Sequence, residues 1–430
     1  MFDIAVLAIN FFVALFFLKE RSSALLGYLI FFQEVHLIPF ANLELELYGY
    51  IYYVLIVVFY LIFVARLRVS RRWLSYLVTD GVFISLLILT FAIGLHAIIG
   101  VQNEIGQVIL VRYFFQVVPA LIFLFLVLGD NLNIEELQTG IIVYGIFLFV
   151  ILLLTTDAMN MASIQRGLIR EEIQISPIAL SRIGGIILIT SFFALFRNKG
   201  GLNIIVIYTA ILISLFMMAL GMSRGPFVSL LIAFVFYLIF SRFGSLKYLL
   251  KIVVFTTPVI LILILVVNNL EIAAVDVLMS RFGELQDVQS IGRYSRYELF
   301  FIYFVTDFTL LSFEFLYGWG PDGFNIYSGM GYVHNLIFES IFEYGLFGLI
   351  FIVLFTFSSF NKSILILKSN VPRHYLYVPI LFVMLYSTSM FSGDIIASRN
   401  IMFIAVIQVS MVYIIRKSAT NQVMYSENTD

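Results

Sequence analysis

Long apolar runs recur along the whole chain and constrain its fold more than any other feature of the sequence. Thirteen runs are long enough to cross the roughly 30 Å hydrocarbon core of a bilayer as helices. They lie near residues 2–18, 22–40, 48–65, 74–100, 108–128, 139–155, 178–196, 202–221, 226–240, 247–267, 335–357, 375–391 and 400–415. The runs at 139–155 and 226–240 are short, and the run at 74–100 is long enough to contain a boundary. The sequence therefore predicts an all-α polytopic membrane protein with about 12–13 transmembrane helices.

The composition excludes a water-soluble domain. Hydrophobic residues make up 62% of the 430 residues and charged residues 12%, and the mean hydropathy is +1.05, so these residues could not form a polar surface. The net charge of −1 gives no indication of a nucleic-acid partner, and none is expected. Without cysteine the chain has no disulfide, thiol nucleophile or zinc–thiolate site. The first run lacks a basic flank and a small-residue cleavage site, so we expect a retained helix and a single integral membrane domain over residues 1–430.

The basic residues assign each loop to a side of the membrane, because lysine and arginine are enriched in cytoplasmic loops. The strongest anchor is the connection ARLRVSRRW, whose four arginines are Arg66, Arg68, Arg71 and Arg72. With this connection inside, alternation also places inside the segments that carry Lys19/Arg21, Arg197/Lys199, Arg242/Lys247/Lys251, Lys362/Lys368/Arg373 and Arg416/Lys417. The acidic turn GDNLNIEE near Asp130 gives no indication of its side.

Every basic residue left on the outer side is an arginine. These residues are Arg112, Arg166, Arg170, Arg182, Arg224, Arg281, Arg293, Arg296 and Arg399. Lysine serves the positive-inside rule about equally well, so the absence of lysine favours a role for the guanidinium fork, which donates two parallel hydrogen bonds to phosphate. The alternative interpretation is compositional drift together with side chains that snorkel at helix ends.

Two outer loops are large. The first covers residues 157–177 and contains DAMNMASIQRGLIREEIQIS, and the second covers residues 268–333 and carries candidate site residues. In the second loop, the apolar segment LFFIYFVTDFTLLSFEFLYG is interrupted by Asp307 and Glu314 and is too polar to span comfortably. We therefore expect an interfacial or re-entrant helix there.

No internal repeat is visible in the sequence, which counts against transporters built from two matching halves.

The stretch GWGPDGFNIYSGMGYVHNLIFESIFEYGLFG, residues 318–348, combines glycines, a proline and a His-Asn pair with an apolar helix. Three glycines around the proline break regular structure and let the backbone fold tightly or approach a ligand. They are Gly318, Gly320 and Gly323.

The second half of this stretch places ionisable residues in a membrane helix. The last transmembrane hairpin is expected to begin near Asn335, which puts His334 at the outer mouth of a helix. Helical spacing aligns Asn335 with Glu339 and Glu343. Because charges in a membrane helix are costly, we weigh a functional role of Glu343 against a structural pairing with a neighbouring helix. Two glycines that allow close contact with another helix follow, Gly345 and Gly348.

A shorter stretch, GMSRGPFVSLL, places Arg224 at the outer end of a helix and Pro226 at the first position of the next. Its turn exposes backbone N–H groups and a helix N-terminus to the outer side, and both suit anions. The tripeptide SRG alone indicates little.

Five short motifs follow one another in the order SRGP (223–226), GRYSR (292–296), GWGPDGF (318–324), HN (334–335) and EYGLFG (343–348). In this order, and on one side of the membrane, they resemble the pattern of the O-antigen polymerase and O-antigen ligase superfamily of polytopic membrane glycosyltransferases. The resemblance covers about residues 178–357. It places the family's arginines on Arg224 and on Arg293 or Arg296, its histidine on His334 and its glutamate on Glu343.

The resemblance implies an enzyme of lipopolysaccharide or related polysaccharide biosynthesis at the outer face of the bacterial cytoplasmic (inner) membrane. It would join oligosaccharide repeat units linked to undecaprenyl pyrophosphate. His334 and Glu343 would be catalytic, with Glu343 orienting the histidine or an arginine. The expected pyrophosphate-binding residues are Arg224, Arg293, Arg296, Arg182 and Arg112, and the expected contributors of loop and backbone groups are Gly318, Gly320 and Asn335.

Arginines can neutralise the charge that develops on the departing pyrophosphate, as a divalent metal does elsewhere. No cluster of outer carboxylates has metal-ligand spacing, so neither a metal nor another cofactor is expected. The expected partners are the undecaprenyl-pyrophosphate-linked oligosaccharide, membrane lipid, a chain-length regulator and a flippase.

Polymerase is favoured over ligase because the chain ends soon after its last apolar run and shows no feature directed at a lipid A core acceptor. Ligase stays open as the alternative, as does polymerisation of capsule or exopolysaccharide. From another class, a lipid-linked oligosaccharide flippase or transporter would be expected to line a central cavity with charges in both halves. A membrane protein without catalysis would leave the outer arginines unexplained.

Overall fold

A computed structural model describes residues 70–100, 104–129, 132–155, 177–197, 202–221, 223–241, 294–306, 312–329, 335–392 and 398–427, with residues 23, 24, 27, 309 and 333 besides. These residues form helices and turns and contain no strand. The outer loop at 157–176 and the beginning of the second outer loop, up to residue 293, lie outside them.

The chain divides into two compact units, and each is described by itself. Among the described elements, the first unit comprises α9 (Ile134–Thr155), α11 (Pro177–Ala194), α12 (Ile204–Gly221), α13 (Arg224–Phe240), the 3₁₀ turn η5 (Arg373–Leu376) and α20 (Tyr377–Ser392) as far as Met384. The second comprises α5 (Arg71–Val78), α6 (Gly81–Ile99), α7 (Glu104–Arg112), the π-helical turn η1 (Tyr113–Val117), α8 (Val118–Val127), α16 (Tyr294–Thr306), α17 (Phe313–Tyr317), α18 (Gly323–Ser328), α19 (Leu336–Lys368), the rest of α20 and α21 (Arg399–Glu427).

The apolar runs that fall on described residues are helices, which confirms the predicted helical class for this part of the chain and is consistent with a polytopic membrane protein. Six helices of the described part are long and apolar enough to cross a membrane. They are Gly81–Ile99, Glu104–Leu126, Ile134–Leu153, Leu336–Lys368, Arg373–Phe391 and Arg399–Thr420. Three shorter apolar helices correspond to the runs at 178–196, 202–221 and 226–240. The runs at 2–18, 48–65 and 247–267, and most of 22–40, lie outside the described residues.

The run at 74–100 contains the boundary that its length allowed. Helix α5 ends at Val78, and Asp80 starts α6 by accepting a hydrogen bond from the Val82 backbone N–H (2.9 Å). Along α6, Leu87, Phe91 and Ile98 are exposed. Large apolar side chains on the outside of a helix suit a lipid environment. This helix is therefore built as a membrane span.

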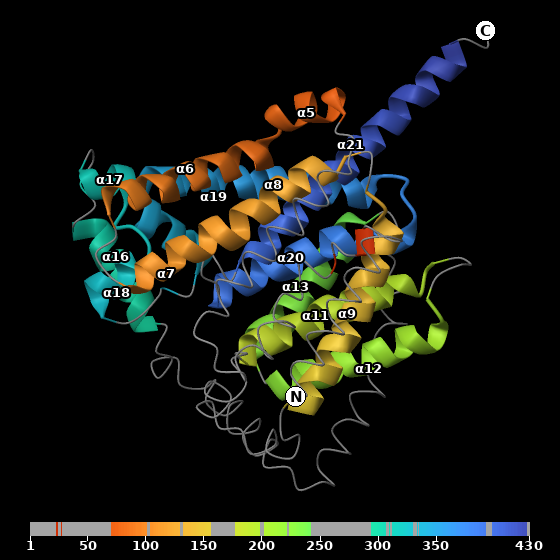
Figure 1. Cartoon of the computed structure of the whole chain (residues 1–430), viewed down its shortest axis with the longest axis horizontal. Coiled ribbons are helices and arrows are strands. Elements are labelled where there is room, and N and C mark those ends of the chain that lie inside the picture. Colours follow the sequence, from red (N-terminus) through yellow and green to blue (C-terminus); the bar gives the residue numbers. More distant parts are fainter. Residues whose placement is uncertain are drawn as a thin grey trace, which may run out of the picture. The chain divides into compact units, whose positions relative to one another are not determined.

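In the second unit, α6 and α19 run side by side in opposite directions (Figure 1). Near one end, Asp80 forms a buried ion pair with Lys362 of α19 (3.0 Å). Near the other end, the His96 ring meets the Tyr344 ring edge-on, with centroids 5.9 Å apart. Helices α16, α17 and α18 gather at this second end (Figure 1). The glycine-rich stretch at 318–323 therefore lies at the end of the pair opposite Lys362.

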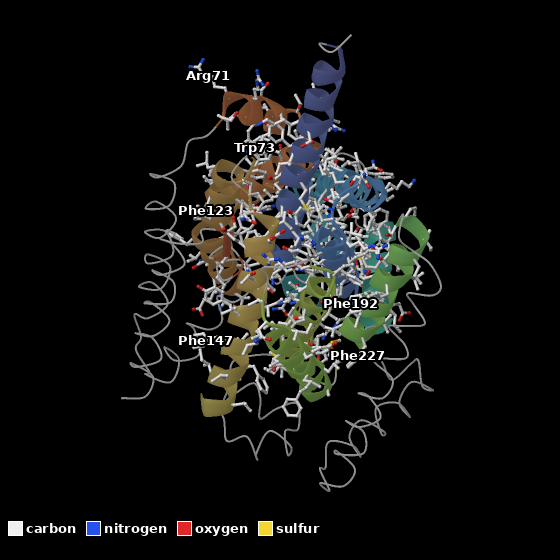
Figure 2. All side chains as sticks on the ribbon, turned by 90° about the vertical axis from the view of Figure 1, so that its right-hand side faces the viewer. Arg71, Trp73, Phe123, Phe147, Phe192 and Phe227 are labelled. Carbon is white, nitrogen blue, oxygen red and sulfur yellow. The ribbon has the colours of Figure 1, made fainter. Side chains whose placement is uncertain are left out.

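Helix α5 belongs to the Lys362 end. Figure 2 shows Arg71 projecting away from the helices, whereas Trp73 is turned toward them. The Trp73 indole N–H donates to the Phe125 backbone carbonyl (2.7 Å). The Arg416 guanidinium lies over the Tyr76 ring, 6.0 Å from its centroid. Three basic segments that the positive-inside rule places on one side thus also share one end of the second unit.

The first unit has a polar cluster at the end where α9 begins and α11 ends. Glu135 pairs with Arg197 (2.6 Å) and contacts the His374 imidazole (3.2 Å). Arg197 also donates to the Thr139 hydroxyl (3.3 Å). Glu135 belongs to the acidic turn GDNLNIEE, and Arg197 and Arg373 belong to segments expected inside. The carboxylate of this turn is therefore held by segments of the same expected side.

Candidate functional site

The glycine-rich loop GWGPDG is bonded to α19 through the Glu343 carboxylate. Glu343 is buried, and its Oε1 accepts a hydrogen bond from the Asp322 backbone N–H (2.9 Å). A charged acceptor strengthens such a bond, and burial makes its loss costly. The sequence left open a structural pairing of Glu343 with a neighbouring helix. Glu343 does have a structural partner, but this partner is the backbone of the loop. Glu343 therefore fixes the position of the loop.

Helix α19 is broken at Gly345, whose backbone angles (φ 56°, ψ −133°) are not helical. A helix that ends or breaks leaves its last carbonyls without a partner inside the helix. Here the loop supplies donors to two of them: the Trp319 N–H donates to the Phe342 carbonyl (3.0 Å) and the Gly320 N–H donates to the Glu343 carbonyl (2.8 Å). The loop and the break thus satisfy each other's backbone groups.

Close backbone approach explains the glycines at this junction. A Cβ on Gly318 would lie 2.3 Å from the Glu343 carbonyl carbon and oxygen, and a Cβ on Gly345 would lie 2.6 Å from the Phe315 carbonyl oxygen. Both glycines also have positive φ (77° and 56°), which side chains disfavour. A Cβ on Gly348 would lie 1.7 Å from the Ser340 carbonyl oxygen. The expected contact of Gly348 with another helix is therefore a contact between the two halves of α19.

His96 is a site residue that the sequence reasoning missed. Its Nε2–H donates to the Tyr317 backbone carbonyl (2.8 Å), since a carbonyl can only accept. A Cβ on Gly320 would lie 2.9 Å from the His96 Nδ1, so the loop also passes closely over the ring. The sequence signal that could have identified His96 was a histidine inside the apolar run at 74–100, where a titratable group is costly.

Asp322 is the second residue that the sequence reasoning passed over, although it lies inside the quoted motif GWGPDGF. It adopts the left-handed conformation (φ 64°, ψ 15°), which asparagine and aspartate tolerate better than other residues with side chains. Its side chain is buried, and its Oδ2 accepts a hydrogen bond from the Asn325 amide (3.1 Å). The buried carboxylates of Asp322 and Glu343 thus lie on the same loop-to-helix junction.

Asn335 begins α19, as expected, but it does not continue the helical stripe. Its backbone is extended (φ −146°, ψ 118°), and its Oδ1 caps the helix by accepting from the N–H groups of Ile337 and Phe338 (3.0 and 3.3 Å). Its Nδ2 donates to the Met390 carbonyl in α20 (3.2 Å). Asn335 therefore aligns the start of α19 with α20, and Glu339, one turn further on, is buried.

Arg296 lies on α16 at the start of an aromatic cluster, which we define as Tyr297, Phe300, Tyr303, Trp319, Phe324, Tyr327, Phe338 and Phe342. The Phe300 ring stacks on Phe338 (centroids 4.4 Å apart, 17° between planes), and the Tyr297 ring meets Phe338 edge-on (5.6 Å). This packing holds α16 against the first turn of α19. Half-buried Arg296 therefore lies one residue before a ring that packs on the first turn of α19.

Arg112 occupies a different position in the second unit. It is the last residue of α7, it is exposed, and the π-helical turn η1 follows it directly. The Tyr113 hydroxyl of η1 hydrogen-bonds the Thr90 hydroxyl halfway along α6 (3.0 Å). Arg112 therefore directly precedes a residue that contacts the middle of α6.

Arg182 and Arg224 belong to the first unit and lie toward the same end of it. Arg182 is half-buried next to Ser181, whose hydroxyl donates to the Met218 carbonyl near the end of α12 (3.2 Å). Helix α13 begins at Arg224, so Pro226 is its third residue rather than its first. Proline is tolerated there because the N–H groups of the first turn lack partners inside the helix. The cluster around Glu135 lies at the opposite end of this unit.

Two of the expected site residues, His334 and Arg293, lie outside the described residues, as does the side chain of Arg224. In the part of the chain that the structure describes, no three histidine, aspartate or glutamate side chains converge as metal ligands. The contacts in the structure bring together Gly318, Gly320 and Glu343, and they add His96 and Asp322 to this group. Asn335 and Arg296 lie on elements packed at the same end of α19.

Comparisons with known proteins return no match: no family model, no curated protein and no solved structure matches this sequence.

Proposed function

We propose that the protein is a polymerase of O-antigen or a related surface polysaccharide, embedded in the bacterial cytoplasmic membrane with its site on the outer face. The observation that carries the proposal is the docking of the GWGPDG loop onto Glu343 at the broken end of α19. Two motifs of the resemblance, separated in the sequence, are joined there by two hydrogen bonds to Glu343, and a third bond joins Trp319 to the adjacent Phe342. A family pattern that arose by chance would not require its motifs to meet.

A second support is the distribution of charge within each unit. In the second unit, Lys362, Arg71 and Arg416 lie at the end of the bundle opposite the glycine-rich loop. In the first unit, Arg182 and Arg224 lie toward the end opposite Arg197. In each unit, residues expected on the cytoplasmic side thus lie at one end, and residues expected on the outer face lie at the other: the glycine-rich loop in the second unit, and Arg182 and Arg224 in the first.

The proposed reaction is a glycosyl transfer. A hydroxyl of a new lipid-linked repeat unit attacks the anomeric carbon of the growing chain, forming the new glycosidic bond as the bond from that carbon to the pyrophosphate breaks. The hydroxyl proton passes to His334, and polyprenyl pyrophosphate leaves with its electron pair. Arg224, with Arg293 or Arg296, binds the charge that develops on the leaving group. Glu343 keeps the glycine-rich loop in place through the Asp322 amide.

Deletion of the gene tests this function. We expect cells with a single repeat unit attached to the surface acceptor, because export and ligation continue while chain extension stops. Electrophoretic banding of extracted polysaccharide measures this. Loss of a ligase would instead leave no repeat on the acceptor and polymer on the lipid carrier, and loss of a flippase would trap repeat units on the inner leaflet. Either of these patterns, or normal chain lengths, would contradict the proposal.

A further inference from the structure

Two exposed aromatic residues stand beside the loop that Glu343 holds. Trp319 and Tyr327 each keep 38% of their surface exposed. Their rings meet edge-on with centroids 5.6 Å apart. Trp319 also stands nearly parallel to Phe342 (6.4 Å, 23°), and the Tyr327 ring meets Phe342 at 61° (5.9 Å). Both rings are thus supported from behind by the aromatic cluster and open on another side.

The indole N–H of Trp319 is turned inward, where it donates to the Tyr303 hydroxyl. A tryptophan that anchors a protein at the membrane interface usually turns its polar end toward the wet side. Here the polar end is used inside the protein, so the exposed part of Trp319 is carbon surface. This arrangement favours stacking against a ligand over anchoring in the lipid interface.

Polar groups border the aromatic pair. The Asp322 carboxylate and the Asn325 amide, which hydrogen-bond each other (3.1 Å), lie in the turn and helix between Trp319 and Tyr327. A pyranose ring has faces of C–H groups and a rim of hydroxyls. Its partly positive C–H hydrogens suit the negative face of an aromatic ring, and its hydroxyls suit carboxylate and amide groups.

The support of the pair is rigid. The Trp319 and Gly320 amides are bonded to α19, and the Asp322 amide is bonded to Glu343. A Cβ on Gly323 would lie 2.5 Å from the Trp319 Cβ, so α18 begins directly against Trp319. A platform fixed before the ligand arrives loses little freedom on binding.

We propose that Trp319 and Tyr327 form a platform for a pyranose ring, a subsite that holds a sugar of the oligosaccharide repeat unit next to Glu343. This inference rests on the proposed function, and it names the part of the substrate that this loop recognises. The half-buried Asn325 amide, which the buried Asp322 carboxylate holds by a hydrogen bond (3.1 Å), binds hydroxyls at the rim of the sugar.

The chain offers a built-in reporter because it has only two tryptophans, Trp73 and Trp319. Trp73 is 1% exposed. The full chain in lipid nanodiscs is titrated with the repeat-unit oligosaccharide released from the strain's own polysaccharide, and tryptophan emission is recorded. We expect a saturable change that the Trp319→Phe variant loses while the Trp73 emission persists. Sorbitol, which has hydroxyls but no pyranose ring, should give no saturable change.

Variants test the affinity by saturation-transfer NMR of the same oligosaccharide. Trp319→Ala and Tyr327→Ala should each raise the half-saturating concentration at least about tenfold. The control is Tyr208→Ala, an exposed tyrosine of α12 (53% exposed), which should leave it unchanged. Unchanged thermal unfolding of the Trp319→Phe protein shows that the fold is kept.

If tryptophan emission does not change with the oligosaccharide, or changes equally with sorbitol, the proposed sugar platform is wrong. Quenching of Trp319 by lipids brominated in their acyl chains, without any sugar response, assigns the pair to the membrane interface and also overturns it. Failure of the proposed function looks different. Normal chain lengths in the deletion strain would reject the polymerase while leaving a measured sugar affinity standing.

Discussion

The Glu343 carboxylate accepts a hydrogen bond from the Asp322 backbone N–H at 2.9 Å, and both residues are buried. A residue that its sequence context presents as a membrane-embedded charge is thus the acceptor that holds a loop in place. Glu343 therefore has two properties that substitutions can test separately: an oxygen that accepts this hydrogen bond, and a negative charge.

Glu343→Gln and Glu343→Ala should therefore differ in stability. Glutamine retains an oxygen acceptor for the Asp322 N–H, so we expect thermal unfolding of the purified protein close to that of the unsubstituted chain. Alanine leaves that buried donor without a partner, which costs about 1–3 kcal/mol. If both variants unfold alike, the bond does not hold the loop. If Glu343→Gln is stable yet fails to restore chain length in the deletion strain, the charge itself is needed.

Gly345→Ala should prevent α19 from forming its break. The backbone angles of Gly345 (φ 56°, ψ −133°) are accessible essentially to glycine alone, and the new Cβ also meets the Phe315 carbonyl oxygen at 2.6 Å. We expect little folded protein by fluorescence-detected size exclusion. Gly329→Ala is the matched control, because Gly329 has a positive φ (67°) with nothing within 4 Å of its Cβ position. Equal yields from the two variants would contradict the geometry of the break.

Lys362→Met should destabilise the protein strongly, because it leaves the Asp80 carboxylate buried without its cation. Breaking a buried pair on one side costs about 3–5 kcal/mol. The double variant Asp80→Asn with Lys362→Met removes both charges and keeps an oxygen acceptor for the Val82 N–H, so most of the stability should return. Thermal unfolding in detergent measures this cycle. A double variant as unstable as Lys362→Met alone would show that the two side chains are not coupled.

Reporter fusions test the sides assigned from the basic residues. Fusions at Lys199, Lys247 and Lys368 should report the cytoplasm, and fusions at Arg170, Gly292 and Asp394 should report the outer side. Because Lys362 and the loop at 318–323 lie at opposite ends of the α6–α19 pair, they must report opposite sides whichever way the chain is inserted. An outer reading at Lys247 would place the motifs in the cytoplasm and end the proposed mechanism.

Arginine-to-lysine substitutions test the guanidinium forks. Arg224→Lys and either Arg293→Lys or Arg296→Lys should severely shorten the polysaccharide in complemented deletion cells, because lysine keeps the charge but loses the paired hydrogen bonds. His334→Ala should also abolish extension. Blots of membrane fractions control for abundance. Wild-type chain lengths from both His334→Ala and Arg224→Lys at normal abundance would remove these residues from the site.

Much of the architecture follows from the sequence, because a helix that crosses a bilayer needs an apolar run of a defined length. The start of α19 was also predictable, since Asn335 precedes an apolar run and asparagine is a favoured cap. The break at Gly345 was not. EYGLFG reads as a continuous helix, and the break depends on amides of Trp319 and Gly320 that are remote in the sequence.

The candidate site was less predictable than the fold for the same reason. His96 contacts the Tyr317 carbonyl across 221 residues of sequence, and no local pattern indicates such a contact. The acidic turn GDNLNIEE, which gave no indication of its side of the membrane, contains Glu135. The partners of Glu135 are Arg197 and His374, which come from two distant segments. Short motifs indicate candidate site residues, but they do not indicate which atoms those residues contact.

The break in α19 also bears on the way the chain is synthesised. The amides that bond to the carbonyls of Phe342 and Glu343 lie about twenty residues upstream, so they leave the ribosome before α19 does. Backbone carbonyls that lack a hydrogen-bond donor are costly in the bilayer, because the lipid hydrocarbon offers no donor. The amides of the loop at 318–320 are therefore synthesised before the two carbonyls that they satisfy.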